Sequence, residues 1–245
     1  MITDKITKTI IDFTLGDGSM QRATASANAR FKLEHSTKQR DYLWHKIQVL
    51  NALGISGTER INTKTIKGKG YKTISYECFV HPSITTAYKW CYNKGRKTID
   101  KALLRQLDDK SLAYWFMDDG SGPKTYKSTS IVNGTRYEYV YEHPKIEHYS
   151  FSTYNCTLDE LKLLQDWLLG AFNVKTRLKL DKRAKTCLGA FIVTCGIDNK
   201  DILRAVLEPN IIESMRYKIT GAHSFVHIPV VSIDRKRLSG ETPIV

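Results

Sequence analysis

The hydrophobic positions along the chain follow two spacings. Apolar residues three and four positions apart predict helices over residues 5–15, 39–53, 82–92, 158–172 and 198–207. Alternating apolar and polar residues predict strands near residues 29–35, 59–66, 71–80, 127–132, 147–153, 175–180 and 188–195. Strand pairs joined by turns and interspersed with helices indicate an α+β fold.

Two apolar helical segments end in the same dipeptide, Asp-Gly. They are IIDFTLGDG at residues 10–18 and SLAYWFMDDG at residues 111–120. The same order of elements follows each segment, so both halves read αββαββα. Later in each half, GRKTID at 95–100 parallels MRYKIT at 215–220, which places Lys97 opposite Lys218. The repeat predicts two pseudo-symmetric halves, residues 1–108 and 109–228, followed by a tail over residues 229–245.

The second half differs from the first by an insertion near residues 123–145. Asn133-Gly134 lies there between two alternating runs. Asn-Gly is the strongest two-residue signal for a β-hairpin. We therefore expect an extended hairpin with Tyr137, Tyr139 and Tyr141 on one face.

The paired Asp-Gly segments point to a composite acidic site. If the two apolar helices pack together about a pseudo-twofold axis, their carboxyl ends converge and bring Asp17 close to Asp119. A carboxylate at a helix C-terminus opposes the helix dipole, and two neighbouring carboxylates repel each other. A divalent cation removes both penalties, and Mg²⁺ prefers carboxylates with water and phosphate oxygens. Lys97 and Lys218 are candidates to polarise an attacking water or to neutralise charge in the transition state.

Each of these residues also has a structural explanation. A single Asp-Gly is commonly a helix C-cap or a turn, and the two lysines are also explained as ordinary surface residues. Occurrence in both halves favours the functional explanation for Asp17 and Asp119. Asp118 has no counterpart in the first motif, and we expect it to be a solvated neighbour.

The net charge narrows the choice of ligand. The 245 residues include 38 Lys and Arg against 25 Asp and Glu, a net charge of +13. Such a surplus favours a nucleic-acid partner, although a basic protein without a polyanionic ligand has the same composition. Alternate positions of a strand share one face, where basic side chains would line a DNA groove. The candidate DNA-binding residues are Arg30, Lys32, Lys64, Lys67, Lys69, Lys72, Lys124, Lys127, Arg136, Arg177, Lys179, Arg183 and Lys185, with solvated hairpin tips as the alternative.

Cysteine usage and the chain's hydropathy indicate the compartment. The five cysteines are odd in number and contain no CxxC pair, which argues against a disulfide framework or a zinc ribbon. The amino-terminal segment has no signal-peptide pattern, and no apolar run has the length of a membrane span. We expect an intracellular protein with no membrane partner.

The two motifs resemble those of the LAGLIDADG homing endonucleases, in the type in which one chain carries both motifs. The likeness extends from about residue 4 to residue 228. It implies a monomeric pseudo-dimer whose saddle-shaped antiparallel sheets lie on double-stranded DNA with a long asymmetric target site. It also implies Mg²⁺-dependent hydrolysis of both strands to leave short 3′ overhangs, with Mn²⁺ or Ca²⁺ able to substitute for binding. Asp17 and Asp119 would be the metal ligands, helped by the backbone carbonyl oxygens of Gly16 and Asp118, and Lys97 and Lys218 would be the lysine pair.

Some positions depart from the family pattern. Asp12 and Tyr114 replace its small third residue, and Leu15 and Met117 replace its inner acidic one. The seam between the motif helices is therefore expected to pack differently.

The leading hypothesis is a site-specific double-strand DNA endonuclease, intron-encoded or freestanding. Two alternatives use the same fold: an RNA maturase that binds intron RNA and assists group I splicing, and a non-cleaving DNA-binding regulator. Aspartate at both acidic positions disfavours a site that has lost catalysis.

Overall fold

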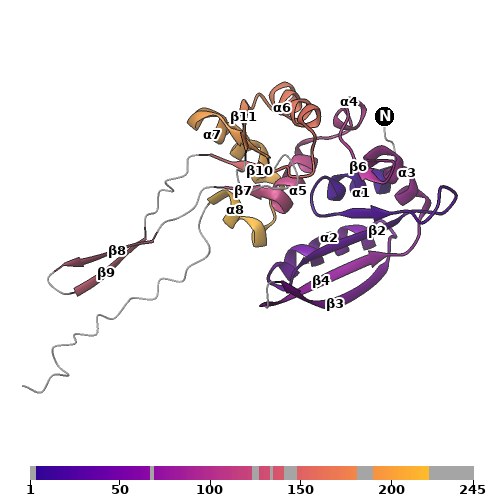
Figure 1. Ribbon diagram of the computed structural model, residues 1–245, viewed down its shortest axis with the longest axis horizontal. Helices are drawn as coiled ribbons and strands as arrows, with labels where there is room; N and C mark the ends of the chain where they lie inside the picture. Colours follow the sequence, from indigo (N-terminus) through magenta and orange to yellow (C-terminus); the bar gives the residue numbers. More distant parts are fainter. Residues whose placement is uncertain are drawn as a thin grey trace, which may run out of the picture.

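Two antiparallel sheets lie on either side of a central pair of helices in the computed structural model (Figure 1). The structure describes residues 4–66, 69–122, 127–132, 135–140, 148–180 and 190–220. The elements of the first half are α1 (Lys5–Leu15), β1 (Ser19–Gln21), β2 (Arg30–Ser36), η1 (Thr37–Gln39), α2 (Arg40–Ala52), β3 (Gly57–Ile66), β4 (Lys69–Cys78), α3 (Pro82–Cys91), β5 (Tyr92–Asn93), β6 (Arg96–Lys97) and α4 (Lys101–Leu104).

The second half repeats this arrangement with a different set of lengths. Its elements are α5 (Asp109–Asp119), β7 (Gly120–Ser121), β8 (Lys127–Val132), β9 (Thr135–Val140), β10 (Ser150–Ser152), α6 (Leu158–Phe172), β11 (Thr176–Leu180), β12 (Ala190–Thr194), α7 (Gly196–Leu207), η2 (Glu208–Asn210), η3 (Glu213–Met215) and α8 (Tyr217–Thr220). The first sheet has the strand order β1-β2-β4-β3, and the second has the matching order β7-β10-β12-β11. The two pseudo-symmetric α+β halves expected from the repeat are confirmed.

The strand that opens each sheet differs from the prediction. The hairpin expected near residues 123–145 is present: β8 pairs with β9 in a two-stranded sheet of its own, with Val132 opposite Thr135. Gly120 and Ser121 of β7 pair with β10 in the position that β1 has in the first sheet. Strands of two or three residues are too short to produce a recognisable alternation, so β1 and β7 were missed. The Asn133-Gly134 turn itself and the tail over residues 229–245 lie outside the described residues.

The two motif helices begin with aspartate caps and form a buried seam. The Asp4 carboxylate accepts hydrogen bonds from the backbone N–H groups of Ile6 and Thr7, and Asp108 caps α5 in a capping box with Ser111. Residues 111–117 of α5 are all buried, because α1 packs on one side of this helix and α7 on another. The apolar character of both motifs is thus explained by their central position.

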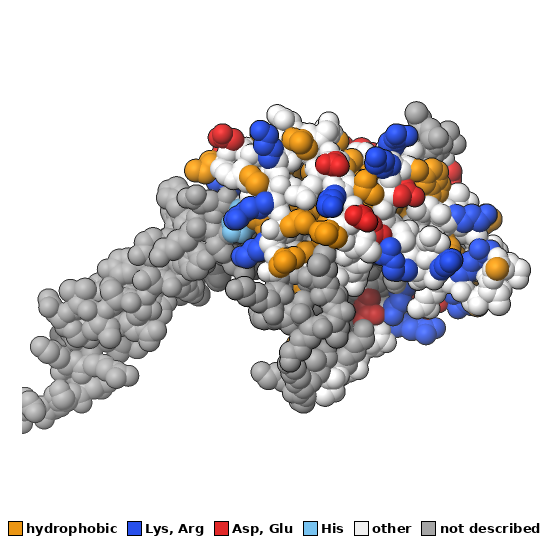
Figure 2. All heavy atoms as spheres, turned by 45° about the horizontal axis from the view of Figure 1, so that its top comes forward, with side chains coloured by type: hydrophobic (Ala, Val, Ile, Leu, Met, Phe, Trp, Pro, Cys, Tyr) orange, Lys and Arg blue, Asp and Glu red, His pale blue; other side chains and the backbone are white. Residues whose placement is uncertain are grey.

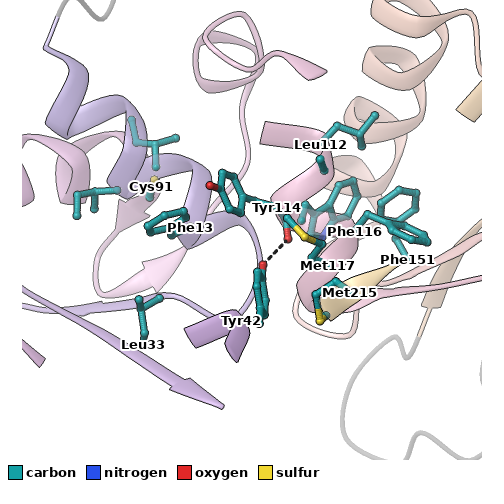
Figure 3. Close-up of a cluster of buried hydrophobic side chains, with 14 of the residues drawn as sticks. Phe13, Leu33, Tyr42, Cys91, Leu112, Tyr114, Phe116, Met117, Phe151 and Met215 are labelled. Atoms are coloured by element: carbon teal, nitrogen blue, oxygen red, sulfur yellow. Dashed lines mark hydrogen bonds between the residues drawn. The ribbon is translucent and has the colours of Figure 1, made fainter. Parts of the chain in front are cut away.

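Polar groups fill the places in this seam where the family pattern has a small residue. Asp12 is buried and accepts hydrogen bonds from the Lys8 ammonium (2.7 Å) and the Ser111 hydroxyl (2.6 Å). The Tyr114 ring packs edge-on against Phe13, with 4.7 Å between ring centroids. Figure 3 shows these rings between the helices, together with the bond that the Tyr42 hydroxyl donates to the Tyr114 carbonyl. The hydrophobic core is therefore continuous across both halves.

The remaining expectations about fold concern cysteines and membranes. Cys78 and Cys91 are buried thiols, Cys156 and Cys195 are half-buried, and none of these four is in a disulfide. Cys187 lies outside the described residues. None of the helices in the described part of the chain has the length and apolar character that crossing a membrane requires.

Candidate active site

The carboxyl ends of α1 and α5 meet at very close range. Gly16 ends α1, and a Cβ atom added there would overlap the side chain of Asp118. The backbone N–H of Asp17 donates a hydrogen bond to the Asp118 carboxylate at 3.0 Å. A glycine before Asp17 is therefore required by the approach of the second motif, and the two motif ends form one site.

Lys97 and Lys218 occupy corresponding places at the two helix ends. The Lys97 ammonium donates to the carbonyl oxygens of Gly16 (2.8 Å) and Gly18 (3.2 Å). The Lys218 ammonium donates to the carbonyl oxygens of Met117 (2.6 Å) and Asp118 (3.0 Å). Each lysine thus binds the carbonyl that precedes a motif aspartate, as the pairing of GRKTID with MRYKIT predicts.

Each lysine comes from an element that is anchored to the second half. Lys97 follows Arg96, whose guanidinium makes two hydrogen bonds to the Glu160 carboxylate of α6, at 3.0 and 2.8 Å. Lys218 precedes Ile219, whose carbonyl accepts a hydrogen bond from the Tyr149 hydroxyl at 2.9 Å. These contacts fix the backbone beside each lysine, and burial lowers the pKa of both ammonium groups while the nearby aspartates oppose that shift.

Burial and neighbouring negative charge raise the pKa of both motif aspartates, Asp17 and Asp119. Burial, followed by the charges of Asp17 and Asp118, raises the pKa of Asp119 to about 7, although Lys97 and Lys218 act in the opposite direction. Burial and the charge of Asp118 also raise the pKa of Asp17, whose side chain keeps 40% of its surface exposed. The site thus contains an accessible carboxylate and a second one that is partly protonated at neutral pH in the absence of a cation.

Asp118 is not the solvated neighbour that was expected. Its carboxylate and the Lys46 ammonium of α2 are both fully buried, at 2.7 and 2.9 Å from one another. The His35 ring of β2 adjoins this pair, with its Nε2 atom 3.4 Å from the Lys46 Nζ atom. Burial, with the charge of Lys46 next, lowers the pKa of His35 to about 4, so the ring is neutral near pH 7.

The sequence patterns missed Lys46 and His35 because both lie among apolar core positions. Lys46 falls on the inward face of a helix and His35 on the inward face of a strand, next to Leu33. The available signal was the position itself, since a charged residue is almost never fully buried unless it is paired. A lysine on the apolar face of α2 therefore predicts a buried carboxylate partner.

Several of these groups have the donor atoms that a divalent cation prefers. Among the described residues, atoms of Asp17, His35 and Asp118 lie within 4.8 Å of one another. The Asp118 carboxylate of this group is already neutralised by the Lys46 ammonium, so Asp17 and Asp119 remain as the accessible carboxylates. Hard oxygen donors of this kind suit hard divalent cations such as Mg²⁺, Ca²⁺ and Mn²⁺.

The first sheet presents a polar face on the side opposite its helices. Register places Arg30 and Lys32 of β2 on this face, and Arg60 of β3, which sequence reasoning missed, lies on the same face opposite Ser75 of β4. Arg30 pairs with Glu77 at 3.3 Å and Lys32 with Glu34 at 2.8 Å.

Strand parity separates Lys72 from the open face of this sheet. The exposed Lys72 has the parity of Ile74 and belongs to the helix side. The backbone of Lys69 is in β4, Lys67 lies outside the described residues, and the side chains of Lys64 and Lys69 are not described. The predicted basic group is thus divided between the two faces.

The second sheet has a corresponding open face. Arg177 and Lys179 are exposed on β11, opposite Val193 and Phe191 of β12, and share their face with Ser150 and Ser152. The backbones of Lys127 and Arg136 belong to the β8–β9 hairpin, whereas Lys124, Arg183 and Lys185 lie outside the described residues.

Positive charge is not confined to these two faces. Figure 2 shows Lys and Arg side chains spread over the visible surface, with acidic side chains between them. Net charge therefore favours a polyanionic ligand but does not locate an interface on the described surface.

Comparison with known proteins identifies the family. The profile described as the LAGLIDADG DNA endonuclease family matches residues 9–196, a span that includes both motifs. The chain belongs to this family.

Relatives in the LAGLIDADG family are distant in sequence, but their alignments cover most of this chain. The chain is 25% identical over 218 residues to "Probable intron-encoded endonuclease 1" of Wickerhamomyces canadensis, covering 86% of this chain and 82% of that protein. It is 24% identical over 218 residues to the DNA endonuclease I-ChuI of Chlamydomonas applanata, covering 84% and 90%. It is also 24% identical over 215 residues to the cytochrome b mRNA maturase bI2 of Saccharomyces cerevisiae, covering 84% of this chain but only 45% of the maturase.

A solved structure supports the same LAGLIDADG fold. It is described as the homing endonuclease I-WcaI bound to its DNA recognition sequence. The TM-score is 0.71 at 21% identity, with 89% of this chain and 88% of that chain covered. At this level of identity the likeness establishes the fold.

Proposed function

We propose that the protein is a monomeric, site-specific endonuclease that hydrolyses both strands of a DNA duplex with the help of a divalent cation. The observation that carries the proposal is the meeting of the two motif aspartates at adjoining helix ends, with one half-buried lysine bound beside each. Membership of the LAGLIDADG DNA endonuclease family supports the same activity.

The chain's own residues fit a divalent cation. Asp17 and Asp119 would bind it, since the charge of Asp17 raises the pKa of Asp119 and a positive charge between them relieves this repulsion. The carbonyl oxygens of Gly16 and Asp118 each accept a lysine bond and keep a second lone pair for the cation. When bound, Mg²⁺ supplies a positive charge that activates water and stabilises the departing oxygen of a phosphodiester. Mn²⁺ or Ca²⁺ would substitute for binding.

Lys97 and Lys218 would act on charge that develops during hydrolysis. Both lysines are half-buried, and each ammonium group is fixed by two carbonyl oxygens. Donors fixed in this way need no reorganisation when a phosphodiester accumulates negative charge. Their positions at the two helix ends suit one lysine to each scissile strand.

The DNA duplex would lie across the open faces of both sheets. Arg177 and Lys179 of the second sheet and Arg60 of the first project from strands whose other face is covered by helices. A relative of the same fold, I-WcaI, is described in complex with its DNA recognition sequence. Two sheets from different halves contact different sequences, which suits a long asymmetric target.

The proposal is tested with a plasmid library of candidate intron-insertion sites incubated with the protein and Mg²⁺. The wild-type protein is expected to linearise one target. Asp17→Asn and Asp119→Asn are each expected to abolish linearisation while DNA binding in Ca²⁺ is retained. Asp159→Asn removes an exposed carboxylate from α6 and serves as the matched control. Failure to cut any library member, or full cleavage by either motif variant, would refute the proposal.

Assistance to intron splicing is the second candidate function. Two relatives of this chain, from Saccharomyces cerevisiae and Debaryomyces hansenii, are described as cytochrome b mRNA maturases, each at 24% identity. Splicing of a group I intron RNA with and without the protein tests this function. Because RNA folding needs no hydrolysis by the motif carboxylates, Asp17→Asn would retain splicing activity and lose DNA cleavage if both functions are present.

A further inference from the structure

The two motif carboxylates differ in the groups that surround them. On the Asp17 side, the His35 Nδ1 atom lies 3.4 Å from the Asp17 Oδ2 atom, and the His35 side chain is only 1% exposed. On the Asp119 side, the described residues provide lysine charges but no side-chain hydrogen bond to the carboxylate. Among the described residues, the two carboxylates thus differ in that Asp17 has a buried histidine nitrogen 3.4 Å away and Asp119 has no such contact.

The tautomer of His35 follows from its neighbours. Its Nε2 atom faces the Lys46 ammonium at 3.4 Å, and an ammonium can only donate. Nε2 must therefore be the acceptor, and the single proton of the neutral ring must be on Nδ1. The Lys46 ammonium is itself fixed by two contacts to the buried Asp118 carboxylate, so the tautomer is fixed by an ion pair.

The Nδ1 proton then faces the motif carboxylate. Within the described residues, Nδ1 has no partner at hydrogen-bonding geometry, and a buried donor without a partner is costly. Gln39 is a second polar side chain at the ring, and its side-chain hydrogen bond with His35 opposes the fall in the pKa of His35. The Asp17 carboxylate is the charged acceptor nearest to Nδ1, with 3.4 Å between Nδ1 and Oδ2.

The second half contains no copy of this arrangement. β10 has the place of β2 in its sheet, since Ser19 of β1 pairs with Lys32 and the corresponding Ser121 of β7 pairs with Ser150. α2 begins eight residues after Lys32, and α6 begins eight residues after Ser150. His35 therefore corresponds to Thr153, and Lys46 corresponds to Leu164. The Thr153 hydroxyl donates to the Ala190 carbonyl at 2.7 Å, and Leu164 is a buried apolar residue. Neither can support Asp119 as His35 supports Asp17.

We propose that His35 is a positioning residue for Asp17 alone, so that the two centres of the nuclease are unequal and only one DNA strand depends on His35. By donating to one oxygen of Asp17, the Nδ1–H group fixes the carboxylate and leaves its other oxygen free for a cation. Groups that orient metal-binding side chains in this way are commonly needed for affinity and activity. The inference rests on the proposed endonuclease function.

The first experiment measures the tautomer without metal or DNA. Nitrogen-15 NMR of the histidine-labelled full chain in EDTA, near pH 7, is expected to show the Nδ1–H form of His35. His35→Asn identifies the signal by its disappearance. A ring protonated on Nε2 would overturn the proposal, whatever the protein does to DNA.

The second experiment measures each centre by itself. Cleavage in Mg²⁺ is followed on the target duplex nicked beforehand in one strand or in the other. His35→Leu is expected to slow hydrolysis of one strand by about tenfold to a hundredfold and to leave the other unchanged. His35→Asn, whose amide nitrogen can replace Nδ1–H, is expected to restore most of the lost rate. His45→Leu, which removes the bond between His45 and the Tyr114 hydroxyl (3.0 Å), is the control and is expected to affect neither strand.

The outcomes separate this inference from the proposed function. If the wild-type protein cuts both strands and His35→Leu slows both equally or neither, the inference is wrong and the nuclease function stands. If the wild-type protein cuts no duplex, the nuclease function is wrong, and the inference about unequal centres falls with it.

Discussion

At the scale of single residues, the negative charges of the three aspartates at the helix ends are compensated in different ways. Asp118 has its own buried cation, Lys46, at 2.7 Å. Asp119 and Asp17 share the two lysines Lys97 and Lys218, which bind backbone carbonyls rather than these carboxylates. The excess negative charge therefore resides on Asp17 and Asp119, and the cost of ionising Asp119 is visible in a pKa near 7.

This cost predicts how the stability of the metal-free protein depends on pH. The pKa of Asp119 is raised from 3.8 to about 7 in the folded state, so the native protein binds this proton more tightly than the unfolded chain does. Between these values the free energy of unfolding falls as the pH rises, and above about pH 7 the full loss is present. Asp119→Asn removes the ionisation and is expected to raise the free energy of unfolding by about 1–2 kcal/mol near pH 8, after discounting for solvent screening.

Denaturant unfolding in EDTA between about pH 4 and pH 8 measures this effect. The difference between Asp119→Asn and the wild-type protein is expected to close towards pH 4, and saturating Mg²⁺ is expected to stabilise the wild-type protein alone. Asp159→Asn, on the exposed side of α6, is the control with an unchanged profile. An equal gain at every pH would contradict the assignment of the effect to Asp119.

The same residues show which parts of the site could be predicted from the sequence and which could not. Asp17, Asp119, Lys97 and Lys218 were recognisable because each pair recurs in the two halves, and the structure brings all four to the same helix ends. The role of Asp118 was not recognisable. Its partner Lys46 is 72 positions away in the sequence, and a pair that occurs once leaves no repeat to detect.

At the scale of elements, two helices start with the same capping arrangement but in different surroundings. The capping box of α6 joins Thr157 and Glu160. The capping box of α5 joins Asp108 and Ser111, and its Ser111 hydroxyl also donates to the buried Asp12 of α1 at 2.6 Å. The start of α5 is therefore part of the seam between the halves, at the opposite end from the active site.

Removing the two caps separately is expected to have unequal effects. Thr157→Ala loses one cap and is expected to lower the free energy of unfolding by about 1 kcal/mol. Ser111→Ala loses a cap contact and also leaves the buried Asp12 with one partner fewer, which adds about 1–3 kcal/mol. Chemical denaturation of both variants at neutral pH gives the comparison. Equal losses would mean that the Ser111–Asp12 bond adds nothing to the seam.

Element positions were predictable where the pattern was long. The periodic segment at 158–172 coincides with α6, and the segment at 5–15 coincides with α1, because both bury one apolar stripe and carry a capping residue. β7 could not be predicted, since two residues pair with β10 only because the end of α5 directs them there. Tertiary position, rather than local pattern, fixes such strands.

At the scale of the whole molecule, the active site belongs to neither half. Asp118 of the second half is neutralised by Lys46 of the first, and Arg96 beside Lys97 is held by Glu160 of the second. The hydrophobic core likewise continues from one half into the other. A duplex would therefore meet one rigid unit with two open sheet faces rather than two separable modules.

That geometry predicts which positive charges contribute to DNA binding. The net charge of +13 is distributed over the surface, but only residues on the open sheet faces would neutralise phosphates. Arg177 projects from the open face of β11, whereas the exposed Lys162 lies on α6, which packs on the other side of that sheet. Each substitution to Gln removes one positive charge, so any difference between the two variants reflects position.

The logarithm of the DNA association constant is expected to fall linearly with the logarithm of salt concentration. Arg177→Gln is expected to make that slope shallower by about one, and Lys162→Gln to leave it unchanged. Fluorescence anisotropy of a labelled target duplex in Ca²⁺, at a series of salt concentrations, measures both slopes. Equal changes in the two variants would mean that DNA binding depends on total charge alone, which would contradict the assignment of the interface to the open sheet faces.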